Sequence, residues 1–509
     1  MSSIERSEGT TESERYLASL ADRSFLNLWS YPNPFIDKMV DGRGKELCDL
    51  LVVCGDHVVV FSDKNIGWPT GVDTELAWRR WYKRAVEKSV RQIRGAARWI
   101  TQYPDRIFLD PECTKQLPIG LPPASRIQLH GVVVARGAGS ACQEFFKGGI
   151  GSLMIAPDIE GAAHFKAETV QPFMIGDVYP DGLFVHVLDD GSLDIVMREL
   201  DTITDLTHYL AKKEALIRSG KLAMSTGEED LVAYYMTHMD SDHEHGFPRP
   251  DGTPLLAEDC IAIRDVYTDL RTDTRYIKRK QADQISYLWD NLIEAFTNHM
   301  LAGTTLVPDG EEFNLEYHEQ GVRYMALVPR YQRRNFGDGI LGALETGAGH
   351  DRFVRAFISK PTAPGSETGF FFMTLQVPKL DLKDGYDQYR AARRSMLETY
   401  AFSFLQKYPH LERVVGIATE PLKKGGEKRK GTSEDLVLAT VSEWSDELLA
   451  DLRARREQYD IMKEGNYHEY AATGSEWPEA EQAPATPNGM NRKQRRAMAA
   501  KKRKGRRRS

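Results

Sequence analysis

The spacing of apolar residues predicts two long helices in the first hundred residues of the chain. The first is expected from Ser13 to Trp29, and the prolines that follow, Pro32 and Pro34, end its pattern. The second is expected from Thr74 to Gln102, because apolar side chains recur in it near the helical period. Its apolar positions are Trp78, Trp81, Ala85, Val90, Ile93, Ala97 and Ile100.

Between these helices, two apolar runs predict a β-hairpin. The runs are Glu46–Val53 and His57–Asp63, and the Gly55-Asp56 pair between them is typical of a tight turn. Two further strands are expected at Arg106–Leu109 and Ile127–Ala135. This part of the chain therefore predicts the order helix, strand, strand, helix, strand, strand, with the second helix packed on a mixed sheet.

The remainder of the chain predicts a mixture of helices and strands. A strand at Leu183–Leu188 precedes a helix that ends near Ile217, and Thr202 with Asp205 forms a variant capping box at its start. Later segments predict helices at Tyr287–Leu301 and Tyr386–Lys407 and strands at Phe370–Val377 and Val414–Thr419. The predicted fold class is α/β (α+β): an N-terminal mixed sheet flanked by helices, followed by a second α+β region.

Length and local changes in composition predict how the chain is divided. Its 509 residues are too many for one hydrophobic core, so two or three domains are expected. We expect disordered residues at 1–10, an N-terminal domain at 11–165, a connecting α/β segment at 166–230, a C-terminal α+β domain at 231–475 and a disordered basic tail at 476–509.

Charge is distributed unevenly along the chain. The net charge is −7, but the last 19 residues contain eleven Lys or Arg and no acid. The rest has 56 basic against 74 acidic residues, a net charge of −18. A uniformly basic protein that coats nucleic acid is thus excluded, and any nucleic-acid site in the body of the chain is expected to be local and assisted by a metal ion.

The cysteines and the hydropathy pattern indicate a cytoplasmic protein that does not enter a membrane. The five cysteines are scattered without a CxxC pair, which favours buried thiols in a reducing compartment. The polar N-terminus lacks the features of a signal peptide, and no stretch approaches the length of a membrane span.

Candidate chemistry lies at the ends of the predicted hairpin strands. Asp49 stands in an otherwise apolar run, where a carboxylate is costly unless it is paired or binds a metal ion. Lys64 ends the partner strand, and alternation places residues 62 and 64 on one face. Phosphodiester hydrolysis needs carboxylates that hold a hard cation, with a lysine beside them to orient water or neutralise charge.

In its order of elements, this segment resembles the PD-(D/E)xK nuclease superfamily, in particular Mrr-type restriction endonucleases and Holliday-junction resolvases. Asp49 and Lys64 match the motif directly, and Gln92 resembles the glutamine of the following helix. The resemblance implies that residues 11–165 form a nuclease-like domain. It also implies that an acid of the first helix, Glu12 or Glu14, assists the site.

The motif departs from the family at Ser62, where an acid is expected. Asp63 supplies the missing acid only if a β-bulge turns its side chain towards Asp49. The candidate catalytic residues are Asp49, Asp63, Lys64 and Gln92, and the candidate ligands of Mg²⁺ or Mn²⁺ are Asp49, Asp63 and Glu46. Without the bulge, Asp49 and Glu46 alone would hold the ion, or the domain would not cut.

Three functions follow from these residues. The first is a metal-dependent nuclease acting on DNA or RNA, a class that often serves bacterial defence. The second is an inactive nuclease-like module that binds nucleic acid or a partner. The third is an interaction protein that its basic tail recruits to RNA. Candidate nucleic-acid contacts are Lys88, Arg492, Lys493, Arg495 and Arg496.

Two weaker signals have alternative interpretations. A polar segment contains His238, Asp240, Asp242, His243 and His245, which together predict either a metal site or, more often, a plain polar loop. Arginines and tyrosines alternate around 323–334, which suits either nucleic acid or a helix face bound to the acidic body.

Overall fold

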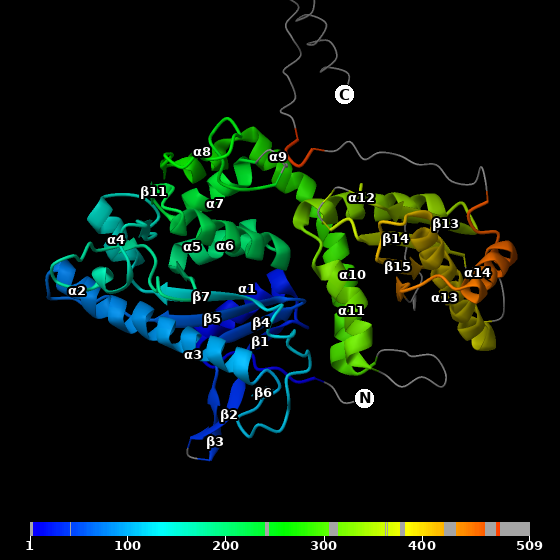
Figure 1. Ribbon diagram of the computed structural model, residues 1–509, viewed down its shortest axis with the longest axis horizontal. Helices are drawn as coiled ribbons and strands as arrows, with labels where there is room; N and C mark the ends of the chain where they lie inside the picture. The colour runs from blue at the N-terminus through cyan, green and yellow to red at the C-terminus, as the bar shows by residue number, and fades with distance from the viewer. Residues whose placement is uncertain are drawn as a thin grey trace, which may run out of the picture.

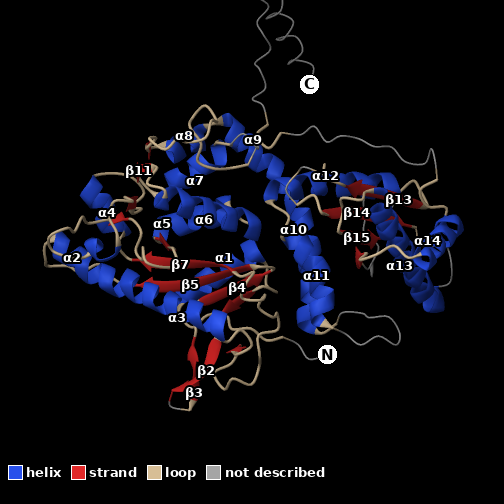
Figure 2. Ribbon diagram, in the orientation of Figure 1, coloured by secondary structure: helices blue, strands red, loops and turns tan. Residues whose placement is uncertain are grey.

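The structure is a computed structural model of the chain (Figure 1). It describes residues 4–40, 42–239, 244–304, 314–361, 363, 365–376, 382–421, 434–463 and 475–478. None of the helices in these ranges is long and apolar enough to cross a membrane. As predicted, the fold is a mixture of helices and mixed sheets (Figure 2).

A five-stranded sheet lies at the centre of the N-terminal half, in the order β1-β4-β5-β7-β10. β4 is antiparallel to β1 and to β5, whereas β7 is parallel to β5 and β10 is parallel to β7. The strands are β1 (Ser30–Pro32), β4 (Leu50–Cys54), β5 (His57–Asn65), β7 (Gln128–Arg136) and β10 (Val185–Leu188).

The predicted hairpin is confirmed as β4 and β5. Cys54 pairs with His57, so the turn between the strands has two residues, and Gly55 adopts a φ of 61° that favours glycine. All five residues of β4 are buried, because helices cover both faces of the sheet. β4 begins at Leu50, so Asp49 lies just before the strand and not within it.

Helices pack on both faces of this sheet (Figure 1). One face carries α1 (Glu12–Phe25), α5 (Asp190–Glu199) and α6 (Ile203–Arg218), and Thr202 caps α6 as predicted. The other face carries the predicted long helix, which consists of α2 (Thr74–Tyr82), a π-helical turn (Lys83–Glu87) and α3 (Lys88–Gln102).

Two smaller sheets flank the central one. The sheet β3-β2-β6 consists of β2 (Phe35–Val40), β3 (Arg43–Glu46) and β6 (Ile107–Phe108). The sheet β12-β11-β8-β9 consists of β8 (Met154–Ile155), β9 (Met174–Ile175), β11 (Leu222–Ser225) and β12 (Ile261–Ile263). The helical segments near the second sheet are α4 (Gly139–Phe146), a 3₁₀ turn (Gly161–His164), α7 (Glu228–Thr237), α8 (Val266–Thr272) and α9 (Thr274–Ala282).

The C-terminal part is built on a four-stranded sheet with helices on both faces. Alternate residues of β14 enter two cores: Phe370 and Phe372 join the large core with α12, and Phe371 and Met373 join a smaller core with α13. The elements are a 3₁₀ turn (Asp283–Ser286), α10 (Tyr287–Ala302), α11 (Leu315–Ala326), α12 (Arg330–Gly347), β13 (Arg352–Phe357), β14 (Thr368–Leu375), α13 (Leu382–Lys407), β15 (Arg413–Thr419), β16 (Asp435–Thr440) and α14 (Asp446–Tyr459).

Two expected boundaries differ from the structure. Because β10 completes the central sheet and α5 packs on it, the boundary expected at residue 165 falls inside one layered unit. The tail was expected to lack structure from residue 476, but Ser475–Pro478 is seated against the body of the protein. The basic residues Arg492, Lys493, Arg495 and Arg496 lie outside the described residues.

Candidate active site

The backbone of Asp49 is fixed between two strands. Its N–H donates to the carbonyl oxygen of Phe61 at 3.1 Å, and its own carbonyl accepts from the N–H of Asn33 at 3.0 Å. The residue is 2 % exposed. A carboxylate buried to this degree needs partners, and those partners define the site.

Three groups donate hydrogen bonds to the Asp49 carboxylate. Lys64 Nζ lies 2.9 Å from Oδ2 and 3.3 Å from Oδ1, and the N–H of Asp63 lies 2.5 Å from Oδ2. Gln92 Nε2 lies 3.5 Å from Oδ1. The structure thus brings together Asp49, Lys64 and Gln92, which sequence reasoning placed in one site.

Ser62 fixes the orientation of Gln92. Its hydroxyl, fully buried on the α3 face of β5, donates to Gln92 Oε1 at 3.0 Å. With its oxygen held there, the amide presents its NH₂ group to Asp49. The serine in the acid position of the motif therefore contributes a neutral hydrogen bond where an acid would contribute charge.

The side chain of Asp63 does not reach the site, although its backbone N–H does. The register of β5 against β7 runs without a shift from His57 to Asn65, so the bulge that would turn Asp63 towards Asp49 is not formed. Its carboxylate instead lies 3.0 Å from Arg136 Nε on the opposite face of the sheet. Burial raises the pKa of Asp63, although Arg136 opposes the shift. The expected placement of Asp63 beside Asp49 is corrected accordingly.

Glu46 supplies a second acid to the site from β3. Burial raises its pKa to about 7, and a hydrogen bond with Asp49 and the charges of Asp49 and Glu14 act in the same direction. Lys64 is the group that opposes this shift. Of the two acids proposed on the first helix, Glu14 is therefore the one near the site, whereas Glu12 is exposed.

The donors suit a hard cation in type but are few. In the part of the chain that the structure describes, no three His, Cys, Asp or Glu side chains are placed to hold a metal ion. Glu46 and Asp49 are a carboxylate pair whose mutual repulsion a cation would relieve. Asp63 is ion-paired with Arg136. Of the three candidate ligands, Glu46 and Asp49 are therefore the two that remain for Mg²⁺ or Mn²⁺.

Comparisons with protein-family models, with curated proteins and with solved structures found no significant match.

The other sequence signals are placed differently. Lys88 is exposed at the start of α3, one turn before Gln92. His238 stacks on Tyr234, with ring centroids 3.9 Å apart, and His245 pairs with Glu476, while 240–243 lie outside the described residues. The described ends of the histidine segment therefore have structural partners.

The arginines of α12 belong to a buried ion-pair network. Arg330 and Arg333 both bond to Asp290, at 2.7 and 2.6 Å, and Arg330 also bonds to Asp201 at 2.8 Å. Arg334 bonds to Asp283 at 3.1 Å. Of the two interpretations, a helix face bound to the acidic body is the one that the structure bears out for these residues.

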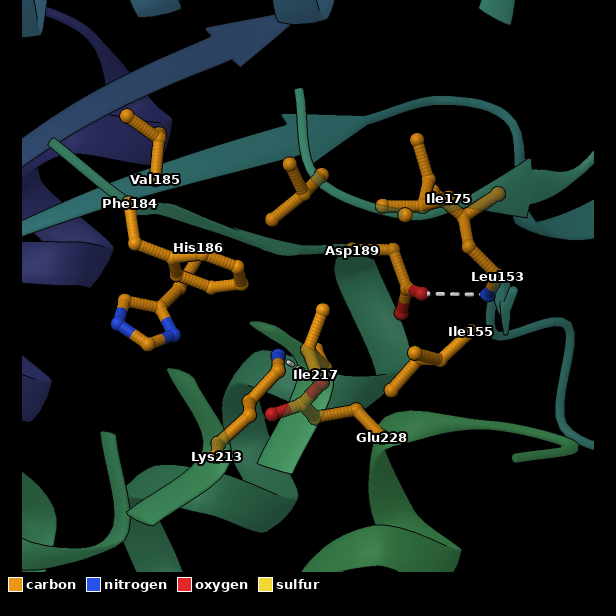
Figure 3. Close-up of a pocket in the computed structure, with 12 residues that line it drawn as sticks. Leu153, Ile155, Ile175, Phe184, Val185, His186, Asp189, Lys213, Ile217 and Glu228 are labelled. Carbon is orange, nitrogen blue, oxygen red and sulfur yellow. Dashed lines mark hydrogen bonds and ion pairs between the residues drawn. The ribbon is translucent and has the colours of Figure 1, made fainter. Parts of the chain in front are cut away.

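Sequence reasoning missed a second charged cluster, between α6 and α7 (Figure 3). Lys213 Nζ lies 2.5 Å from Glu228 Oε2, and Tyr209 donates to the other oxygen of Glu228 at 2.6 Å. The adjoining cavity, lined also by His186 and Asp189, measures about 10 Å³, enough for about one water molecule. The run Glu228-Glu229-Asp230 was the available signal, since acids favour a helix N-terminus. The cluster is too closed to admit a substrate.

Proposed function

We propose that the protein is a metal-dependent nuclease that hydrolyses phosphodiester bonds in DNA or RNA. The observation that carries the proposal is the convergence of Asp49, Lys64 and Gln92 at one end of β5, with Glu46 as a second acid. The order of elements gives further support, because α1, the hairpin β4–β5 and the long helix come in the order that the nuclease resemblance implies.

Each residue has a role that its position allows. Glu46 and Asp49 would hold Mg²⁺ or Mn²⁺, which would activate water and stabilise charge on the phosphate. Lys64 is the accessible cation of the site, with 32 % of its side chain exposed, so it can turn from Asp49 to a phosphate oxygen. Gln92, held by Ser62, positions Asp49.

The outer surface of the long helix supports a nucleic-acid substrate. Between residues 80 and 98 the sequence has one acid, Glu87, in a body whose net charge is otherwise negative. Cationic side chains on a helix beside the site would contact phosphates. The exposed residues are Arg80, Lys83, Arg84, Lys88, Arg91, Arg94 and Arg98.

The test is cleavage of supercoiled plasmid, single-stranded DNA and RNA with Mg²⁺ or Mn²⁺. We expect Asp49→Asn, Glu46→Gln and Lys64→Met each to reduce the rate at least about a hundredfold, because each removes a charge from the site. Asp56→Asn is the matched control, since Asp56 lies in the turn at the far end of the same hairpin. Cleavage that survives Asp49→Asn would reject the proposal.

A nuclease-like module that binds without cutting is the second candidate. The placement of Ser62 and Asp63 favours it, because neither adds a charged ligand to the site. This candidate requires that the wild type neither cleaves nor binds Mn²⁺ in calorimetric titration. It also requires that Lys88→Glu weakens nucleic-acid binding more than Asp49→Asn does.

A further inference from the structure

Four residues near the C-terminus, Ser475–Pro478, lie against α9 (Figure 1). The last strand and helix before them, β16 and α14, belong to the C-terminal sheet and its covering helices. Ser475–Pro478 thus contacts a surface made by segments more than a hundred residues earlier in the chain. A short peptide held in this way has the features of a ligand in a receptor site.

Two nitrogen donors, one from an arginine and one from a histidine, converge on the Glu476 carboxylate. Arg279 Nη2 of α9 lies 2.9 Å from Oε1, and His245 Nε2 lies 2.9 Å from Oε2. Each carboxylate oxygen therefore has its own nitrogen donor from a separate segment. This arrangement recognises a carboxylate by both charge and shape.

Arg334 binds the backbone of the same four-residue segment. Arg334 Nη2 of α12 donates to the carbonyl oxygens of Ser475 and Glu476, at 2.9 and 3.0 Å. Arg334 is itself held by Asp283 at 3.1 Å, so the donor is fixed before any peptide is present. Contacts with the backbone of the peptide are of the kind that a peptide-binding site uses for affinity.

An apolar surface receives the next residue. Trp477 packs against a small cluster contributed by α5, α7 and α8, and the Arg279 guanidinium lies 4.9 Å from the centre of its ring. The cluster consists of Ile195, Ala233, Tyr267 and Leu270. An acid followed by tryptophan is therefore the sequence that this surface fits.

Arg279 has two further nitrogen atoms that could donate hydrogen bonds to a ligand. Arg279 is 7 % exposed, yet its Nε and Nη1 atoms form no hydrogen bond with any residue that the structure describes. The nearest further carboxylate, Asp283, lies 3.9 Å from Nε. A buried guanidinium with this spare capacity suits an acidic ligand better than a packing role.

We propose that Arg279, Arg334, His245 and the apolar cluster form a binding site for a short peptide with an acidic residue followed by tryptophan. Ser475–Pro478 occupies this site in cis. Occupancy attaches the following basic tail, 479–509, to the body of the protein at α9. A peptide of the same chemistry from another chain would compete for the site and release the tail.

The first experiment uses the full chain with the site vacated by Glu476→Ala and Trp477→Ala together. A fluorescein-labelled peptide of residues 471–480 is titrated and followed by anisotropy. We expect saturable binding at least about tenfold tighter than to the wild type, whose own segment competes at high effective concentration. Peptides with Gln for the acid or Ala for the tryptophan should bind at least about tenfold more weakly.

The matched control compares two arginines of α9. Adding Arg279→Ala to the vacated chain should abolish binding, whereas adding Arg275→Ala should leave it unchanged, because Arg275 is exposed and pairs with Asp273. Equal binding to the wild type and the vacated chain overturns the proposal. So does a vacated chain that melts like the wild type but binds no peptide.

A second measurement avoids the double variant. Hydroxyl-radical footprinting measures how fast an exposed tryptophan ring is oxidised, and in the wild type Trp477 should be oxidised slowly because it is packed in the site. Glu476→Gln, or an excess of the unlabelled peptide, should increase that rate several-fold, while Glu479→Gln should not. An unchanged rate in both tests overturns the proposal even if the vacated chain does not fold.

Discussion

Two lysine–carboxylate pairs lie at opposite faces of the central sheet, and they differ in how completely they are enclosed. Lys213 and Glu228 have side chains 4 % and 3 % exposed, and Tyr209 completes the shell around them. Lys64 and Asp49 have side chains 32 % and 2 % exposed, and a further acid, Glu46, shares a hydrogen bond with Asp49. The first pair is closed and balanced, whereas the second is open to solvent and has excess negative charge.

The enclosed pair, Lys213 and Glu228, contributes to stability, whereas the open pair, Lys64 and Asp49, is suited to binding and chemistry. A buried and balanced pair holds α6 to α7 and leaves no room for a substrate, since the cavity beside it admits about one water molecule. An open pair with an extra acid stabilises the fold less, but its excess negative charge can be neutralised by a metal cation, and its partly exposed lysine can bind a phosphate. Substitution of Lys213 should therefore reduce mainly stability, and substitution of Lys64 mainly activity.

The largest effect is expected from Lys213→Met. It leaves the Glu228 carboxylate buried without its cation, so the free energy of unfolding should fall by about 3–5 kcal/mol. Lys64→Met should lower it less, by about 1–2 kcal/mol, because the Asp49 carboxylate keeps the hydrogen bonds from the Asp63 N–H and from Gln92. Urea denaturation of both variants measures the difference, and equal losses would remove the basis of the comparison.

Acid should weaken the region around the closed pair. Burial lowers the pKa of His130 to about 4 and lowers the pKa values of His57 and His186. The charged or titratable groups that face these rings are His208, Lys213, Arg218 and Asp56.

Because the unfolded chain binds protons at these histidines more readily, their contribution to stability is complete above pH about 6.5. It is lost as the pH falls towards 4. His130 alone accounts for about 3 kcal/mol over this range. Urea midpoints between pH 7 and 4.5 test this: His130→Gln should flatten the decline, and the exposed His299→Gln should not.

A smaller loss is expected from Asp63→Asn. Among the described residues, the one ion pair left to Arg136, which is buried on the α5 face, would be its 3.8 Å contact with Asp190, so stability should fall by about 2 kcal/mol. Cleavage and Mn²⁺ binding should remain, because Asp63 points away from Asp49. Loss of Mn²⁺ binding in a folded Asp63→Asn variant would show that Asp63 is a ligand after all.

Local patterns in the sequence predicted the part of the site that lies on regular elements. Strand alternation placed Ser62 and Lys64 on one face, and the nuclease resemblance singled out Gln92 on the following helix. The same alternation placed Asp63 on the opposite face, and the regular register of β5 agrees with it. A metal site would need a second acid, which favoured a β-bulge at Asp63. The alternation of the strand predicted the position of Asp63 correctly, and the bulge is not formed.

Contacts between segments far apart in the chain could not be predicted from local sequence patterns. Glu46 was named as a ligand from a predicted strand, yet it reaches Asp49 from the inserted hairpin β2–β3, whose place depends on the pairing of β2 with β6. β10 joins the sheet about fifty residues after β7, a parallel pairing that no local signal reveals. Glu476 lies in a stretch whose composition predicts disorder, and only its three-dimensional partners distinguish it.

The smallest effect is expected from Ser62→Glu, which is also the most specific test of the site around Asp49 and Lys64. The substitution adds a carboxylate on the α3 face of β5, two residues before Lys64 and beside Gln92. Hard cations gain most from charged oxygens, so Mn²⁺ affinity should rise about tenfold, which corresponds to about 1.4 kcal/mol. Ser62→Gln has the same size without the charge and should not raise the affinity. If both variants bind Mn²⁺ like the wild type, Glu46 and Asp49 do not form a metal site and the open pair is better interpreted as part of a binding module.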